Sequence, residues 1–115
     1  MEAKISLKNV RSNPQILEFI KESDRSLAML GYTDHGLRHL DLVALRAREI
    51  SRKIGLAPRE QELSAIAGFC HDMGNFMGRT DHHYWGALLF HQVFESQMPP
   101  AEMVPIVQAI ANHDK

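Results

Sequence analysis

The sequence predicts an all-α fold, a helical bundle of about five helices, on three observations. Apolar residues recur at intervals near 3.6 residues in several segments, and glycines and prolines separate these segments. No segment shows the two-residue alternation with β-branched residues that is typical of a half-buried strand. The chain has 115 residues, of which 44% are hydrophobic, enough for one domain with one core. We therefore expect residues 1–115 to form a single domain.

The first predicted helix has clear signals at both ends. Asn13 is a suitable N-cap, Pro14 suits the first helical position, and Gly31 ends the segment. The residues before this helix show no strong apolar periodicity. We therefore expect residues 1–12 to be loosely attached.

The second and third predicted helices follow at once. Thr33 or Asp34 can cap the second, which ends at Gly55, whereas the third begins at Pro58 and stops at Gly74. The second helix has the clearest apolar stripe in the sequence, which we expect to face the core. It consists of Leu37, Leu40, Val43, Ala44, Ala47, Ile50 and Ile54.

The last two predicted helices lie beyond the connecting loop "NFMGRT". Thr80 or Asp81 is a good cap for the fourth helix, which contains "WGALLFHQVF". A Pro-Pro pair separates it from the last helix. Pro105 lies either in the first turn of that helix or marks its true start.

Charge and composition exclude several classes of protein. The 13 basic and 14 acidic residues are mixed, without the one-signed field typical of nucleic-acid or membrane-surface binders. Cys70 is the single cysteine, and "MEAKISLKNVRSNPQ" lacks the apolar core of a signal peptide, which together predict a cytoplasmic protein. No apolar run approaches the roughly 20 residues that span a bilayer.

Histidine stands out, because imidazole is a common metal ligand and titrates near neutral pH. The chain has seven, at positions 35, 39, 71, 82, 83, 91 and 113. His71 and Asp72 are adjacent in the last turn of the third predicted helix, where both side chains can reach one divalent ion as the helix ends. The alternative is a surface pair or a cap on the last carbonyls.

Other candidate residues have two interpretations each. His39 lies at the core edge of the second predicted helix, either as a ligand or as a hydrogen-bonded structural residue, and His35 stands one turn earlier on the same face. Arg79 can neutralise a substrate phosphate, because guanidinium matches phosphate geometry, or it can be a solvated loop arginine. We expect His83 and His91 to lie at the surface or behind the ligands.

Four ordered motifs resemble those of the HD-domain metal-dependent phosphohydrolases. They are "HGLRHLDLVALRA", "AIAGFCHDMGN", "DHHYWGALLF" and "VPIVQAIANHDK", and together they span roughly residues 33–115. The resemblance implies a helical bundle in which the first histidine, the His-Asp pair and a later aspartate hold one metal ion. In the two-metal HD-GYP subgroup, the carboxylate of the pair bridges both ions. That role would fall to Asp72.

The resemblance also implies a wider ligand set. His82 stands four residues before Gly86, as a ligand of those relatives does, and His113 with Asp114 matches their histidine-containing pair. His35 occupies the place where some relatives have a glutamate ligand. The implied metal ligands are therefore His39, His71, Asp72, His82, His113, Asp114 and His35.

Two departures from the family pattern affect these expectations. The final metal-binding aspartate of the family lies on a further helix, so we expect either that this chain is C-terminally truncated or that water or another subunit completes the site. Asn75 stands where HD-GYP relatives commonly carry a lysine that helps hold phosphate. With the short loop between His71 and His82, this argues against a cyclic-di-GMP enzyme.

The implied activity is hydrolysis of a phosphate ester by metal-activated water. The cofactor would be one or two divalent ions, from Mn, Fe, Mg, Co, Ni or Zn, and the substrate a small, nucleotide-like phosphomonoester, nucleotide or phosphodiester. Catalytic roles fall to Asp72, His82 and His113, with the two histidines as second-metal ligands or acid-base groups, and substrate binding to Arg79 and Asn75. The alternative is a non-catalytic regulatory or interaction module with bound metal. A homo-oligomer is left open, and a structural zinc site is disfavoured for want of thiolates.

Overall fold

The computed structural model describes residues 4–32 and 36–113 of the chain. These residues form six α-helices and one short 3-10 helix and contain no strand, so the all-α prediction is confirmed. The helices are α1 (Leu7–Arg11), α2 (Pro14–Met29), α3 (Leu37–Lys53), α4 (Pro58–Cys70), η1 (Asn75–Met77), α5 (His82–Phe94) and α6 (Pro100–Asn112).

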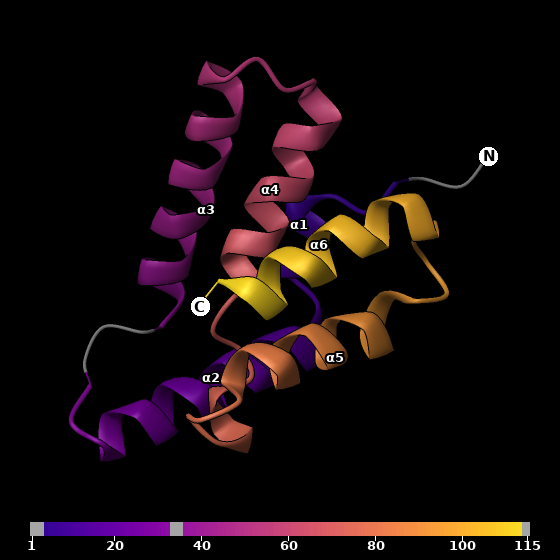
Figure 1. The fold of residues 1–115 in the computed structure, drawn as a ribbon. Coiled ribbons are helices and arrows are strands. Elements are labelled where there is room, and N and C mark those ends of the chain that lie inside the picture. Colours follow the sequence, from indigo (N-terminus) through magenta and orange to yellow (C-terminus); the bar gives the residue numbers. More distant parts are fainter. Residues whose placement is uncertain (1–3, 33–35, 114–115) are drawn as a thin grey trace.

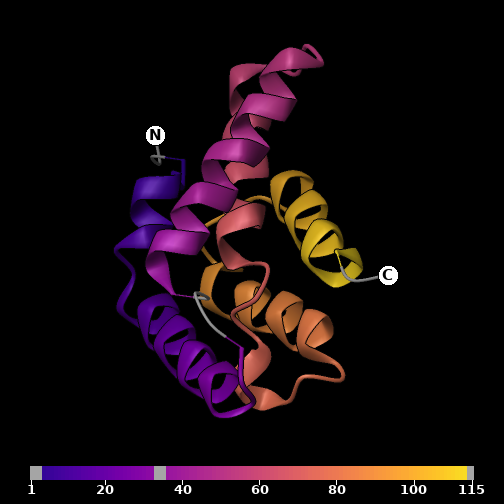
Figure 2. The same cartoon turned by 90° about the vertical axis from the view of Figure 1, so that its left-hand side faces the viewer.

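The helices are arranged as a hairpin standing on a layer of further helices (Figure 1). α3 and α4 run antiparallel and pack closely on each other, and their connected ends project beyond the other helices in both views (Figure 2). α5 packs on α6, and α6 packs on α4, while α2 packs on η1. The core between them includes Ile16, Leu40, Ile66, Phe69, Phe90, Phe94, Ile106 and Ile110.

Local sequence signals account for most helix ends. The Asn13 side chain accepts hydrogen bonds from the backbone N–H groups of Gln15 and Ile16, and Pro14 occupies the first helical position of α2, as predicted. Gly31 and Gly55 have φ values of 91° and 87°, a left-handed conformation that glycine adopts without strain. Each therefore ends a helix where the sequence predicts an end.

The N-terminal segment differs from the expectation of loose attachment for residues 1–12. Residues 7–11 form α1, whose Val10 side chain is fully buried in the core. The guanidinium of Arg59 donates a hydrogen bond to the carbonyl of Ile5, and the Arg11 guanidinium pairs with both oxygens of Asp41 on α3. The described part of this segment is thus tied to two other helices.

The apolar stripe of α3 is only partly buried, contrary to the prediction. Leu40 and Ala44 are buried, but Ile50 and Ile54 are 62% and 70% exposed. The C-terminal half of α3 has α4 alone beside it, because the hairpin projects beyond the other helices (Figure 2). The predicted caps Thr33 and Asp34 lie outside the described residues, and α3 begins after Gly36.

Two other predicted boundaries differ from the structure, whereas the start of the fourth predicted helix is confirmed. α4 ends at Cys70, before the predicted stop, so the His-Asp pair follows the helix instead of forming its last turn. Asp81 is the N-cap of α5, but its side chain makes no capping hydrogen bond. α6 starts at Pro100, so Pro105 lies inside the helix in its second turn, neither in its first turn nor at its start.

Ion pairs tie the hairpin to α6 and join its two helices to each other. Arg59 on α4 binds both carboxylate oxygens of Glu102 on α6, at 2.9 and 2.6 Å. Arg48 on α3 lies 3.0 Å from a carboxylate oxygen of Glu62 on α4.

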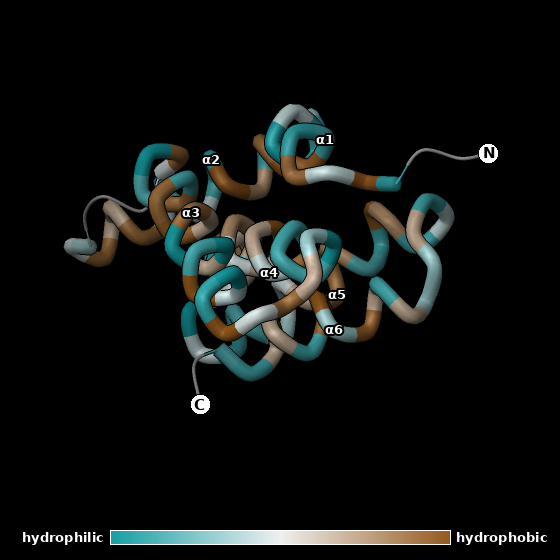
Figure 3. The backbone as a smooth tube through the Cα atoms, turned by 90° about the horizontal axis from the view of Figure 1, so that it is seen from above, coloured by the Kyte–Doolittle hydropathy of each residue, from teal (hydrophilic) through white to brown (hydrophobic). Residues whose placement is uncertain are grey.

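Polar and apolar residues alternate along the helices (Figure 3). Among the described residues, no helix is both long and apolar enough to cross a membrane.

Candidate metal centre

The turn that follows α4 carries His71 and Asp72, and close backbone packing fixes its position. A Cβ atom on Gly74 would lie 2.2 Å from the carbonyl oxygen of His82 and 2.5 Å from the backbone nitrogen of Gly86. Only glycine permits this approach of the turn to the first turns of α5. This close approach of the two backbones therefore places Asp72 beside His82.

A buried serine fixes the other side of this turn. The hydroxyl of Ser23 on α2 donates to the carbonyl of Met73 at 2.8 Å and accepts from the N–H of Phe76 at 3.1 Å. The rings of Phe19 and Phe76 stack with their centroids 5.5 Å apart. The turn is thus held between α2 and α5, and Ser23 supports the acidic residue although no sequence motif pointed to it.

Asp72 joins one group of side chains with His82 and His113, from the starts and ends of different helices. Its Oδ1 atom lies 3.6 Å from Nε2 of His82 and 3.6 Å from Nε2 of His113. The two Nε2 atoms are 3.2 Å apart. The three atoms form a nearly equilateral triangle, and these residues are a group that could hold a metal ion.

The other carboxylate oxygen of Asp72 belongs to a second group. Its Oδ2 atom lies 3.2 Å from Nε2 of His71. The ring centroids of His71 and His39 are 6.2 Å apart, and ligand atoms of all three residues lie within 4.8 Å of one another. Asp72 is therefore shared by two groups, with one oxygen facing each.

Three of the four histidines in these groups are oriented by the same kind of backbone hydrogen bond. The Nδ1 atom of His71 lies 2.6 Å from the carbonyl oxygen of Gly68, that of His82 lies 2.8 Å from the carbonyl of Arg79, and that of His113 lies 2.6 Å from the carbonyl of Ile110. In each case the acceptor stands three residues earlier in the chain. A carbonyl can only accept, so each Nδ1 carries the proton. Each ring therefore turns its Nε2 atom toward the Asp72 carboxylate.

This arrangement fits a divalent ion. Ligand atoms about 2.1 Å from a tetrahedrally coordinated ion lie about 3.4 Å apart, close to the separations of 3.2 and 3.6 Å around Asp72 Oδ1. Histidine ligands characteristically donate their second ring N–H to a carbonyl or carboxylate, as these do. A carboxylate with imidazoles suits transition ions and excludes a thiolate-type structural zinc site among the described residues.

The comparison with protein families decides what this fold and these residues belong to. The family model described as "HD domain" matches residues 36–115, more than half of the chain. The chain belongs to the HD domain family. No curated protein and no solved structure gives a significant match. HD domains are in general metal-dependent phosphohydrolases, and the two groups around Asp72 lie within the matched part of the chain.

The electrostatics of this HD domain favour an ionised carboxylate at Asp72 and a neutral imidazole at His82. Burial raises the pKa of Asp72, but the hydrogen bonds and charges of His113 and His71 more than offset it, so that the pKa falls far below its usual range. Burial also lowers the pKa of His82, and the nearby charge of Arg79 lowers it further against the opposing hydrogen bond to the Arg79 carbonyl. Near neutral pH, Asp72 and His82 thus have the protonation states of metal ligands.

The predicted phosphate-binding residues of the HD domain are connected to each other. Nδ2 of Asn75 donates to the carbonyl of Asp72 at 2.8 Å, and Oδ1 of Asn75 accepts from Nη1 of Arg79 at 2.9 Å. The Arg79 guanidinium carbon lies 5.1 Å from the centroid of the Tyr32 ring. Tyr32 could not be predicted as part of the site, because an isolated tyrosine after a helix carries no motif.

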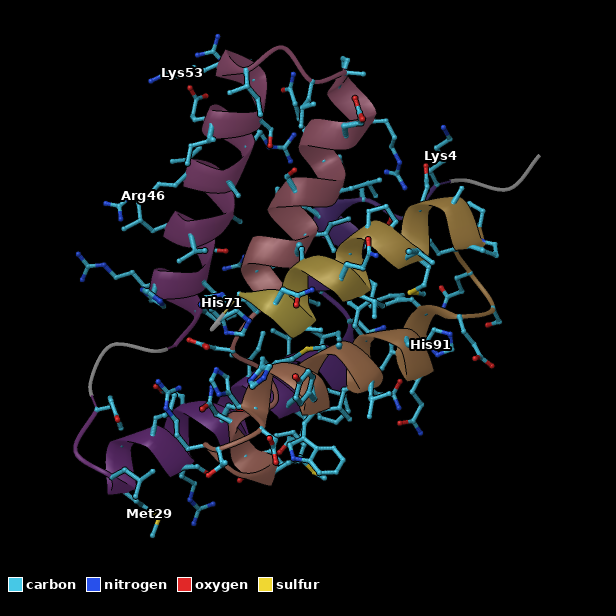
Figure 4. All side chains as sticks on the ribbon, viewed as in Figure 1. Lys4, Met29, Arg46, Lys53, His71 and His91 are labelled. Carbon is cyan, nitrogen blue, oxygen red and sulfur yellow. The ribbon has the colours of Figure 1, made fainter. Side chains whose placement is uncertain are left out.

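The remaining histidines divide by position. His83 lies against the ring of Tyr84, and its ring centroid is 6.2 Å from that of His113, but it belongs to neither candidate ligand group. His91 pairs with Glu95 at the other end of α5, away from His71 (Figure 4). The positions of His35 and Asp114, both predicted ligands, lie outside the described residues.

Proposed function

We propose that this HD domain hydrolyses a phosphate ester with two divalent ions, one held by each side-chain group around Asp72. The observation that carries the proposal is the division of the Asp72 carboxylate, with one oxygen facing His71 and the other facing His82 and His113. A bound divalent ion of this kind activates water near neutral pH and neutralises phosphoryl oxygens. Metal dependence and phosphohydrolase chemistry follow from the family, whereas these ligand roles are our proposal.

The chain's own residues would orient and hold the reacting groups. Asp72 remains ionised through the pKa effect of its histidine neighbours, and its burial limits competition from solvent. His82 and His113 each bind a backbone carbonyl through Nδ1 and turn Nε2 toward Oδ1 of Asp72, as metal-ligating histidines do. We therefore favour metal ligation over acid-base catalysis for both. His39 would complete the group on the side of α3.

Substrate binding would rest on Arg79. It is a cation close enough to His82 to lower the pKa of that ring, and no acidic partner pairs with it among the described residues. Asn75 engages both ends of its amide within the protein. We therefore propose that Asn75 orients the guanidinium and does not itself contact the substrate. The substrate class remains a small phosphate ester, with a nucleotide-like compound as our proposal.

Measurement of bound metal and of turnover tests this function. The purified protein is loaded with Mn²⁺, metal content is determined, and hydrolysis of a phosphomonoester, nucleoside phosphates and a cyclic phosphodiester is followed. Asp72→Asn should abolish both metal binding and turnover, because it removes the shared carboxylate. His91→Ala, a histidine outside both groups, should leave both unchanged. Metal binding without turnover of any substrate would favour a non-catalytic regulatory module instead.

A further inference from the structure

Tyr32 lies just after α2, outside the part of the chain that matches the HD domain, and yet it contacts the candidate site. Its ring faces the guanidinium of Arg79, with 5.1 Å between the guanidinium carbon and the ring centroid. This separation is typical of a cation–π contact, in which the aromatic ring attracts the positively charged guanidinium. The contact joins α2 to the loop that precedes α5.

Arg79 is held from several directions at once. Its Nη1 atom donates to Asn75, which in turn binds the carbonyl of Asp72. Its own carbonyl accepts from Nδ1 of His82. Its guanidinium carbon lies over the ring of Tyr32. Side chain and backbone of Arg79 are therefore both anchored to residues of the candidate metal centre.

The held guanidinium keeps hydrogen-bond donors for a ligand. A guanidinium has five N–H groups in a planar fork. Among the described residues, the Arg79 guanidinium donates to one side chain, that of Asn75. No carboxylate neutralises its charge among the described residues. Planar, uncompensated guanidinium matches the non-bridging oxygens of a phosphate group. Preorganisation matters here, because a long side chain otherwise loses rotamer freedom when it binds.

We propose that Tyr32 is a positioning residue that holds Arg79 ready to bind the phosphate oxygens of the substrate. The proposal rests on the proposed function for the identity of the ligand as a phosphate ester. It makes α2 and the residue after it part of substrate recognition, although the HD domain match begins at residue 36. Tyr32 acts through Arg79 and needs no contact with the substrate.

Four variants test the proposal in the full chain. Tyr32→Leu removes the aromatic face, Tyr32→Phe retains it, Arg79→Gln removes the cation, and the double variant Tyr32→Leu/Arg79→Gln measures coupling. Tyr32→Leu should raise KM by about fivefold, the size of one cation–π contact, with kcat and Mn²⁺ affinity unchanged. Tyr32→Phe should restore the wild-type KM. In the Arg79→Gln background, Tyr32→Leu should add nothing.

A spectroscopic measurement tests the same contact without turnover. In protein labelled with ¹⁵N-arginine, the ring current of Tyr32 should shift the Arg79 Nε–Hε signal, and Tyr32→Leu but not Tyr32→Phe should remove that shift. Inorganic phosphate added to the metal-free wild type should move the same signal. Circular dichroism of each variant controls for folding.

The outcomes separate this proposal from the proposed function. If the wild type hydrolyses phosphate esters but Tyr32→Leu keeps its KM, or if the two substitutions are additive, Tyr32 does not position Arg79. If the wild type shows no turnover, the phosphate titration is the deciding measurement. An Arg79 Nε–Hε signal that does not move when phosphate is added then overturns the proposal. A phosphate response lost in Tyr32→Leu supports it even when hydrolysis is absent.

Discussion

His82 and His113 direct their Nε2 atoms at each other across 3.2 Å, although they stand 31 residues apart, at the start of α5 and just after the end of α6. The Nδ1 atom of each ring is bound to a backbone carbonyl, so both Nε2 atoms present lone pairs unless one is protonated. Two lone pairs at this distance repel each other. A proton or a cation between them turns the repulsion into attraction, and Asp72 supplies the balancing negative charge.

The shared role of Asp72 predicts how metal content changes with substitution. Asp72→Asn should remove both ions, whereas His113→Ala and His71→Ala should each remove one, because each belongs to a single group. Metal analysis after Mn²⁺ loading and gel filtration would give the numbers. His91→Ala serves as the control. Two ions retained in Asp72→Asn would contradict the bridging arrangement.

The close backbone approach at Gly74 predicts a large loss of stability when a single methyl group is added. In Gly74→Ala the new Cβ would lie 2.2 Å from the carbonyl oxygen of His82, and neither backbone can yield without moving the other. We expect a loss of about 1–3 kcal/mol or more in the free energy of unfolding, with weaker metal binding. Thermal unfolding would show it as a fall of about 4 °C for each kcal/mol.

Gly36→Ala is the matched control for that substitution. A Cβ at Gly36 would meet the nearest atom, a carboxylate oxygen of Asp24, at 3.4 Å, an ordinary contact. We expect a smaller loss, of about 0.5–1 kcal/mol, because alanine caps a helix less well than glycine does. Equal losses in the two variants would show that the close approach of the turn to α5 does not govern stability.

Ser23 should contribute to stability through the turn that it binds. Ser23→Ala leaves the carbonyl of Met73 and the N–H of Phe76 without this partner in a buried place. We expect a loss of about 1–3 kcal/mol in the free energy of unfolding, measured by urea denaturation. Ser26→Ala, on the same helix, should change it by less than about 0.5 kcal/mol. A loss confined to Ser26→Ala would refute this role.

The ion pair between α4 and α6 predicts part of the acid sensitivity of the fold. The hydrogen bond from Arg59 is the main cause that holds the pKa of Glu102 below its ordinary value of 4.5. The folded state thus favours the ionised form, so this stabilisation is complete above pH 4.5 and is lost as pH falls through the lower folded pKa.

Urea midpoints measured from pH 7 to pH 3 would reveal this contribution. Glu102→Gln should be less stable than the wild type at pH 7, by about 1 kcal/mol, and the difference should shrink toward acid pH. Glu18→Gln, at an exposed position on α2, should parallel the wild type throughout. A difference between Glu102→Gln and the wild type that grows toward acid pH would have the wrong sign for this pair.

Structural features that depend on neighbouring residues could be predicted from the sequence. The starts of α2 and α4 depend on neighbouring residues such as Asn13 and Pro58, so they are visible in the sequence. The histidines and Asp72 could be singled out because their residue types carry chemistry. The family resemblance implied that the Asp72 carboxylate lies among His39, His71, His82 and His113. The structure brings these residues together in two groups that share Asp72.

The supporting residues could not be predicted in the same way. Ser23 binds atoms 50 and 53 residues further along the chain, and neither partner has a side-chain signature, since both use backbone groups. Tyr32 meets Arg79 only because α2 and the loop before α5 come together. Ile50 and Ile54 fit a helical stripe, but periodicity cannot tell whether another helix covers that stripe.

The hairpin of α3 and α4 has a kinetic consequence for the site. α3 carries His39 and packs chiefly on α4, whereas Asp72, His82 and His113 lie among α2, α4, α5 and α6. Helices with few neighbours open first in native-state fluctuations. An opening of α3 would withdraw His39 and leave the other three residues in place. Two ions bound at this centre would therefore have unequal residence times, with the ion beside His39 exchanging first.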